Sequence, residues 1–187
     1  GLATPAGLSI FAGSRAKPPP VVRLFSFLIP KSELSVTLDV GGTRTDHVIA
    51  QTDGFSPSVI TRPDMPETQD LDKAVSVPLV KLAWGRSGDK GNKANVGIIA
   101  RDAAYLPYIW AALDETAIRD RFGHFMAPGS GFERYLLPGC HGLNILIHEA
   151  LGGGGVASLR NDPQGKAYAQ ILLDYPVPVS RDIAESL

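Results

Sequence analysis

The stretch VPLVKLAWGRSGDKGNKANVGIIAR, residues 77–101, decides the fold that the sequence predicts. Its apolar start, residues 77–85, and its apolar end, residues 95–101, each have the length and composition of a β-strand. Between them Ser87–Asn95 is almost entirely polar, and it is longer than the roughly two to five residues that a hairpin connection needs. The sequence therefore predicts two strands joined by a polar loop.

The side chains of this loop suit it to hold a ligand. Lysines supply positive charge, a carboxylate can act as a base, and glycines expose backbone amides to an anion. A phosphate, a carboxylate or a thioester carbonyl matches such a set, and a solvated loop with no ligand is the open alternative. The residues concerned are Ser87, Gly88, Asp89, Lys90, Gly91, Asn92, Lys93 and Asn95.

Beyond this stretch the spacing of apolar residues predicts a compact α+β layered fold. Asp114 is placed to cap one short helix, and Asp162 with Pro163 to begin the last one. Strands mixed with helices, and few crossovers, argue against a large parallel sheet. The predicted elements are helices at 105–113, directly after Asp114, at 143–151 and at 164–174, and a strand at 132–138.

The part of the chain before residue 75 differs in composition. Residues 21–29 have strand composition, and residues 34–40 and 46–52 flank a GGTR turn, which predicts a β-hairpin. Prolines and acidic residues crowd the stretch around 61–74, which predicts a linker. The predicted division is a flexible leader at 1–20, a β-rich segment at 21–62, a linker at 63–75, the α+β domain at 76–179 and a tail at 180–187.

Composition and charge argue against several classes of function. The formal net charge of −1 provides no electrostatic footprint for nucleic acid or an anionic membrane. No apolar run approaches the roughly 20 residues that span a bilayer. Cys140 is the only cysteine, so no intrachain disulfide can form, and a cytoplasmic location is expected. Because the chain begins at Gly1 without a signal-peptide pattern, we expect a piece of a longer protein.

Other motifs lack the spacing that their chemistry requires. DVGGTRTD (39–46) resembles the phosphate-binding hairpin of actin-like ATPases, but too little chain follows it, and a plain hairpin turn is the interpretation. GGGG (152–155) follows a predicted helix, so it is a helix stop or a close approach of backbone to a ligand. The four histidines show no metal-binding spacing, and Cys140 and His141 are neighbours whose side chains point apart. We predict neither a metal nor a cofactor.

Three longer segments resemble one known family. GRSGDKGNKANVGIIAR (85–101), RYLLPGCHGLNILIHEALGGGG (134–155) and SLRNDPQGKAYAQILL (158–173) are similar to the C-terminal domain of the acyclic terpene utilisation (AtuA-like) family. PVVRLFSFLIPKS (20–32) is similar to the end of that family's larger N-terminal domain. The resemblance implies a ferredoxin-like α/β sandwich at about 75–178, preceded by a β-hairpin-rich segment, with 21–62 as the tail of the larger domain.

The resemblance also implies a role in the catabolism of acyl-CoA thioesters of terpenoids and similar acids. The polar loop and the segment 152–166 would form two walls of an acyl-CoA site, with Asp89 and Lys90 as catalytic residues in hydration or dehydration. The alternative is a non-catalytic assembly domain that docks the larger domain or mediates oligomerisation. The expected partners are the larger N-terminal domain or a partner subunit of the same family, and a homo-oligomer is expected. The expected ligand-binding residues are Ser87, Gly88, Gly91, Asn92, Asn95, Asn144, Gly153, Gly154, Arg160, Asp162 and Lys166.

Overall fold

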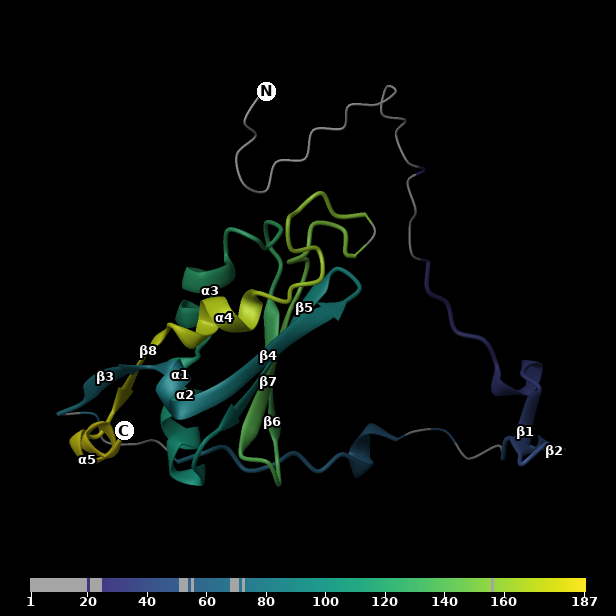
Figure 1. The fold of residues 1–187 in the computed structure, drawn as a ribbon, viewed down its shortest axis with the longest axis horizontal. Coiled ribbons are helices and arrows are strands. Elements are labelled where there is room, and N and C mark those ends of the chain that lie inside the picture. Colours follow the sequence, from purple (N-terminus) through teal and green to yellow (C-terminus); the bar gives the residue numbers. More distant parts are fainter. Residues whose placement is uncertain are drawn as a thin grey trace, which may run out of the picture.

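A four-stranded antiparallel sheet forms the framework of the domain (Figure 1). The computed structural model describes residues 20, 25–50, 54, 56–67, 71, 73–155 and 157–187. The strand order is β4-β5-β7-β6, so two hairpins lie side by side with β4 and β6 at the edges. The first hairpin is β4 (Ala83–Lys90) with β5 (Lys93–Ala100), and the second is β6 (Phe132–Leu137) with β7 (Gly142–Ile147).

Short helices and a second small sheet complete the domain. Two helices connect the hairpins, a third follows β7, and β3 pairs with β8 in an antiparallel ladder. This mixture confirms the predicted α+β class. The elements are β3 (Val75–Pro78), α1 (Leu79–Leu82), η3 (Ala103–Tyr105), α2 (Leu106–Ala112), α3 (Glu115–Phe122), α4 (Tyr168–Leu173), β8 (Pro176–Val179) and α5 (Arg181–Ser186).

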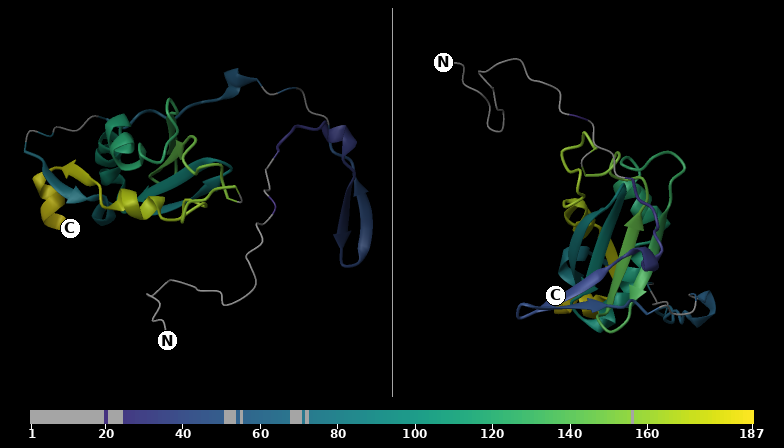
Figure 2. Two further views of the ribbon diagram at one scale, coloured as in Figure 1. Left: turned by 90° about the horizontal axis from the view of Figure 1, so that it is seen from above. Right: turned by 90° about the vertical axis from the view of Figure 1, so that its right-hand side faces the viewer.

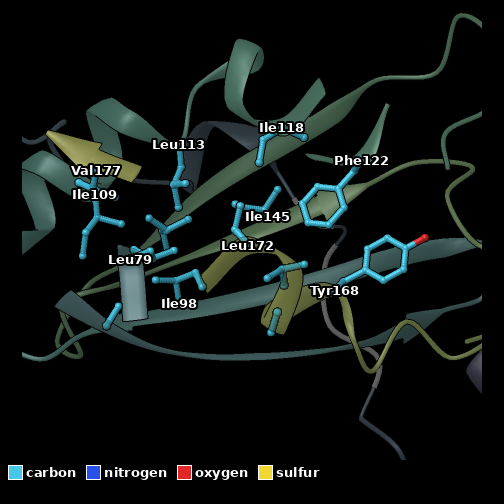
Figure 3. Close-up of a cluster of buried hydrophobic side chains, with 14 of the residues drawn as sticks. Leu79, Ile98, Ile109, Leu113, Ile118, Phe122, Ile145, Tyr168, Leu172 and Val177 are labelled. Atoms are coloured by element: carbon cyan, nitrogen blue, oxygen red, sulfur yellow. The ribbon is translucent and has the colours of Figure 1, made fainter. Parts of the chain in front are cut away.

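One face of the sheet forms the core because side chains alternate between the two faces of a strand. Ile98 of β5 and Ile145 of β7 are at most 1% exposed, and in Figure 3 they lie among helical side chains such as Phe122 and Leu172. Burying each such side chain stabilises the fold by about 1.5–3 kcal/mol. The helices are therefore held on this face by apolar packing.

The other face of the sheet, here called the open face, remains exposed. It carries Trp84, Ile99, Tyr135 and Leu137, whose side chains keep between 38% and 54% of their surface accessible. Arg101 lies over the Trp84 ring, 4.5 Å from its centre. A sheet with one buried and one accessible face is common among antiparallel sheets.

The predicted helices at 105–113 and after Asp114 are confirmed. α2 occupies Leu106–Ala112, and α3 begins at Glu115. The Asp114 carboxylate accepts a hydrogen bond of 2.9 Å from the Ala117 amide, as an N-cap does. The sequence pattern is sufficient here because both the cap and the apolar spacing are local features.

The polar stretch Ser87–Asn95 is not a loop, which corrects the prediction. Pairing continues along both strands to Lys90 and Lys93, and only Gly91 and Asn92 form the turn. Gly91 has a φ of +65°, and glycine at the first position of a two-residue hairpin turn allows this conformation. Polar residues persist to the strand ends partly because Lys90, Lys93 and Asn95 lie on the open face, which can carry them.

The prediction of a helix at 143–151 is also wrong. Residues 142–147 form β7, a central strand that pairs with both β5 and β6. Leu143, Ile145 and Ile147 are fully buried, which is a two-residue period. Isoleucine favours strands. The run is so short and so rich in apolar residues that its spacing fits a helix as well as a strand, which is why the sequence pattern suggested a helix.

Two other predictions are corrected at element boundaries. Residues 77–85 do not form one strand: β3 ends at Pro78, which has no amide hydrogen to continue a ladder, and β4 begins at Ala83 after the α1 turn. The last predicted helix, α4, begins only at Tyr168, because Gly165 has a φ of +61° that no right-handed helix contains. The predicted tail contains a further helix, α5.

The segment before the domain contains the predicted β-hairpin. β1 (Val36–Val40) pairs with β2 (Thr43–His47) in this hairpin. The short helix η1 (Lys31–Glu33) precedes the hairpin, and η2 (Pro57–Val59) follows it. Figure 2 shows the hairpin apart from the four-stranded sheet. The predicted strand at 21–29 is not formed at Phe25–Ile29, because no described residue pairs with this run. Its first four residues, and the predicted leader except Pro20, lie outside the described residues.

Candidate functional site

The two polar segments that the sequence singles out are in contact. The Asn92 side chain donates to the Glu149 carboxylate at 2.6 Å and accepts the Gly153 amide at 2.7 Å. The hairpin turn and the glycine-rich segment pack so closely that a Cβ on Gly154 would lie 2.5 Å from the Gly91 carbonyl oxygen. Gly154 has a φ of +81°, so glycine is required there for both reasons. The segments are therefore packed directly against each other.

Ser87 is engaged inside the protein. It is 6% exposed, and its hydroxyl donates to the Lys166 carbonyl oxygen and accepts the Ala169 amide, both at 2.9 Å. Ala169 lies in the first turn of α4, whose amides have no partners within the helix. Ser87 therefore ties β4 to the start of α4.

Arg160 and Asp162 also make internal contacts. The Arg160 guanidinium donates to the Phe125 carbonyl oxygen at 2.9 Å and to the Ala150 carbonyl oxygen. The Asp162 carboxylate accepts the amides of Lys166 at 2.9 Å and of the following residue at 2.8 Å. These contacts hold the segment after the glycines in place and leave Arg160 poorly placed to bind a ligand.

Asn95 and Asn144 face each other on the open face. Their side-chain amides are hydrogen-bonded across β5 and β7. Asn144 lies in β7 and His148 directly follows this strand, and both are on this face. His148 is 2.7 Å from the Glu133 carboxylate, which also accepts the Tyr135 hydroxyl.

Four cations on the open face, from the middle of β4 to the hairpin turn, are here called the basic row and form a candidate site. They are Arg86, Lys90, Lys93 and Lys166. Arg86 and Lys90 alternate with buried positions along β4, and Lys90 pairs with Lys93 across the hairpin. None of the four forms an ion pair with a described residue; Lys90 donates to the Asp89 carbonyl oxygen at 2.8 Å.

Lys166 joins the basic row because Gly88 has no side chain. A Cβ on Gly88 would point to the open face, between Arg86 and Lys90, and would lie 3.3 Å from the Lys166 ammonium nitrogen. The Lys166 side chain therefore reaches around the edge strand β4. Like charges that face each other across a sheet are destabilising, so a bound anion would relieve the repulsion in this row.

Asp89 lies on the side of the hairpin away from the basic row. Alternation along β4 separates it from Lys90, and its carboxylate oxygen is 3.9 Å from the Cβ position of Gly155. The Asp89 carboxylate makes no hydrogen bond or ion pair with the part of the chain that the structure describes. The predicted catalytic pair is therefore not one constellation.

Burial shifts two pKa values near these elements. Burial raises the pKa of Tyr168, and the nearby Arg160 opposes that shift; the Tyr168 hydroxyl donates to the Ala150 carbonyl oxygen at 2.7 Å. Burial lowers the pKa of Arg134, with Asp114 opposing. The Arg134 guanidinium donates to two carbonyl oxygens near the end of α2, which gives it a structural role.

Two cavities lie away from the basic row, where the segment Ile60–Pro66 runs past β6. One of about 300 Å³ borders α2 and the β6–β7 turn, and one of about 320 Å³ borders Arg134 and Tyr135.

Within the described ranges, no group of three or more His, Cys, Asp or Glu side chains is arranged to hold a metal ion. No described helix is long and apolar enough to cross a bilayer.

Comparison with known families adds one finding. The family model of the AtuA ferredoxin-like domain matches residues 77–178, more than half of the 187-residue chain. The chain belongs to the AtuA-like family. The match supports the ferredoxin-like assignment of this AtuA-like domain, and the β1–β2 hairpin precedes it as predicted. No curated protein and no solved structure matches the chain.

Arg86 is a member of the basic row that the sequence did not suggest as a candidate site residue. The sequence prediction treats Ser87–Asn95 as a loop that contains Lys90. Arg86 then belongs to the strand before the loop, and nothing in the pattern places it beside Lys90. In the hairpin, side chains alternate between the two faces, so Arg86 and Lys90 both lie on the open face. The sequence signal is Gly91–Asn92, which can form a two-residue hairpin turn and so lets the strands continue through the polar residues on both sides.

Proposed function

We propose that this AtuA-like domain contributes to an acyl-CoA-handling site by binding the phosphate groups of the thioester on the basic row. The observation that carries the proposal is that Arg86, Lys90, Lys93 and Lys166 lie along one stretch of the open face without carboxylate partners among the described residues. Phosphates are the anions that lysine and arginine side chains bind well, with arginine able to form two parallel hydrogen bonds.

The proposal changes the predicted set of ligand residues. Lys90 and Lys166 stay, and Arg86 and Lys93 take the place of Arg160, whose guanidinium is occupied by backbone carbonyl oxygens. Asp89 has no part in phosphate binding. Its carboxylate remains the candidate proton carrier for hydration or dehydration beside a thioester carbonyl.

The test is calorimetric titration of CoA into the 187-residue chain and two variants. Lys90→Ala/Lys93→Ala should weaken binding by about 10- to 150-fold for each phosphate interaction that it removes, since a charge-assisted hydrogen bond contributes about 1.5–3 kcal/mol. Lys81→Ala is the control for loss of a lysine charge as such, because it removes one charge from an exposed position on α1 outside the basic row. Equal binding by the double variant and the control would refute the proposal.

A second candidate function, assembly, follows from the apolar end of the open face. Trp84, Ile99, Tyr135 and Leu137 present large exposed side chains on one sheet, and apolar patches of this kind often mark protein interfaces. The larger family domain, a partner subunit or another copy of the chain would cover them. Light scattering tests the last of these partners, another copy of the chain. If copies pair through this face, Trp84→Ser should convert an oligomer to a monomer, and a wild-type chain that is already a monomer would exclude such pairing.

A further inference from the structure

The cavity beside the β6–β7 turn has the character of a binding site for an apolar group. Its volume of about 300 Å³ lies at the lower end of the range for small-ligand pockets. Its walls are mostly aliphatic or proline side chains, among them Leu106, Pro107 and Leu136, and its polar side chains are Asp64 and His141. Pro63, Asp64 and Pro66 border one side, and residues of β6 and α2 border the other.

This cavity is continuous with the open face through two residues. Leu137 and Gly142 line the cavity, and they pair with each other across β6 and β7. Gly142 in turn pairs with Ile99 on β5. The rim of the cavity therefore lies at the apolar end of the face whose other end carries the basic row.

The separation between the two ends limits which ligand could occupy both. Lys93 and Ile99 are on the same strand, six residues or about 20 Å apart, and two further strand spacings of about 5 Å lead to Leu137. Gly97, between them on β5, carries no side chain, and the nearest atom to its Cβ position is a backbone oxygen at 3.8 Å. A ligand that reaches both ends must be long, anionic at one end and apolar at the other.

We infer that the cavity beside the β6–β7 turn binds the acyl chain of the thioester whose phosphates lie on the basic row. The inference rests on the proposed function for the anionic end and adds a site for the apolar end. A CoA thioester has this polarity, with its phosphates and its acyl group at opposite ends of an extended arm. The aliphatic lining selects a hydrocarbon chain over a polar acyl group.

The experiment compares CoA with octanoyl-CoA by calorimetric titration into the 187-residue chain. Octanoyl-CoA should bind at least about tenfold more tightly than CoA, since burial of two methylene groups is enough for such a gain. Leu137→Ser should lower the affinity for octanoyl-CoA about fivefold and leave that for CoA unchanged. Leu159→Ser is the matched control, because Leu159 is fully exposed and lines neither cavity.

The outcomes separate this inference from the proposed function. If CoA and octanoyl-CoA bind equally and Leu137→Ser changes neither, the cavity does not hold the acyl chain, and the phosphate site stands. If neither ligand binds, the proposed function fails and the inference with it. Methyl NMR signals of Leu106 and Leu136 provide a second readout: they should shift with octanoyl-CoA and not with CoA, and unchanged signals would overturn the inference.

Discussion

Replacing Ser87 with alanine tests whether this residue is structural. The substitution removes a hydroxyl that is 6% exposed and that joins the Lys166 carbonyl oxygen to the Ala169 amide at 2.9 Å each. It leaves a buried amide in the first turn of α4 without a partner. Leaving such a group unsatisfied costs about 1–3 kcal/mol, and each kcal/mol lowers the melting temperature of a domain of this size by about 4–8 °C.

Thermal unfolding of Ser87→Ala, followed by circular dichroism, measures this effect against a matched control. Ser130→Ala removes a hydroxyl from an exposed position, where it donates to the Ala127 carbonyl oxygen at 2.8 Å. Because water can replace that contact, the control should change stability by less than about 0.5 kcal/mol. Taking about 2 kcal/mol for Ser87→Ala, we expect a melting temperature about 8–16 °C below that of the wild type.

A second measurement on the same variant separates structure from binding. At a temperature where Ser87→Ala is folded, its affinity for CoA should match that of the wild type, because the Ser87 side chain lies on the buried face of β4 and contacts only the backbone of Lys166, whose ammonium group lies on the open face. The reasoning is refuted if Ser87→Ala melts like Ser130→Ala. Loss of CoA binding with unchanged stability would make Ser87 a ligand-binding residue.

Further expectations concern the turn, a helix cap, the linker and alkaline pH. Gly154→Ala should destabilise the domain by more than about 1 kcal/mol in urea unfolding, because its Cβ would meet Gly91 and its φ is +81°; a neutral effect would show that the contact relaxes. Asp114→Ala should cost about 1 kcal/mol in the same assay, and Asp114→Asn less. Limited proteolysis should cut within 61–73 and leave a stable C-terminal piece; cuts only at the termini would contradict the predicted boundary. Burial raises the pKa of Tyr168 above its ordinary value of 10.0, so its contribution to stability is present below pH 10.0 and is lost as pH rises through the raised value; Tyr168→Phe should show a shallower alkaline loss.

Local signals were enough to predict the α+β class and several elements. Asp114 and the apolar spacing that follows it define α3, and the glycines at 41–42 define the β1–β2 turn, because caps and turns depend only on neighbouring residues. The same local reasoning failed for 143–151. There the strand is set by its two partners, β5 and β6, which lie elsewhere in the chain.

The sequence by itself determined which polar residues are available, and only the tertiary structure decided which of them meet. Ser87 and Lys166 are 79 residues apart, and they are joined because α4 packs beside β4. Register then placed Arg86 and Lys90 on the open face and Ser87 on the buried one, since a shift of one residue reverses every side chain of a strand. Arg160, basic in sequence, is engaged by backbone carbonyl oxygens that no local pattern predicts. The basic row therefore exists only through strand pairing and long-range packing.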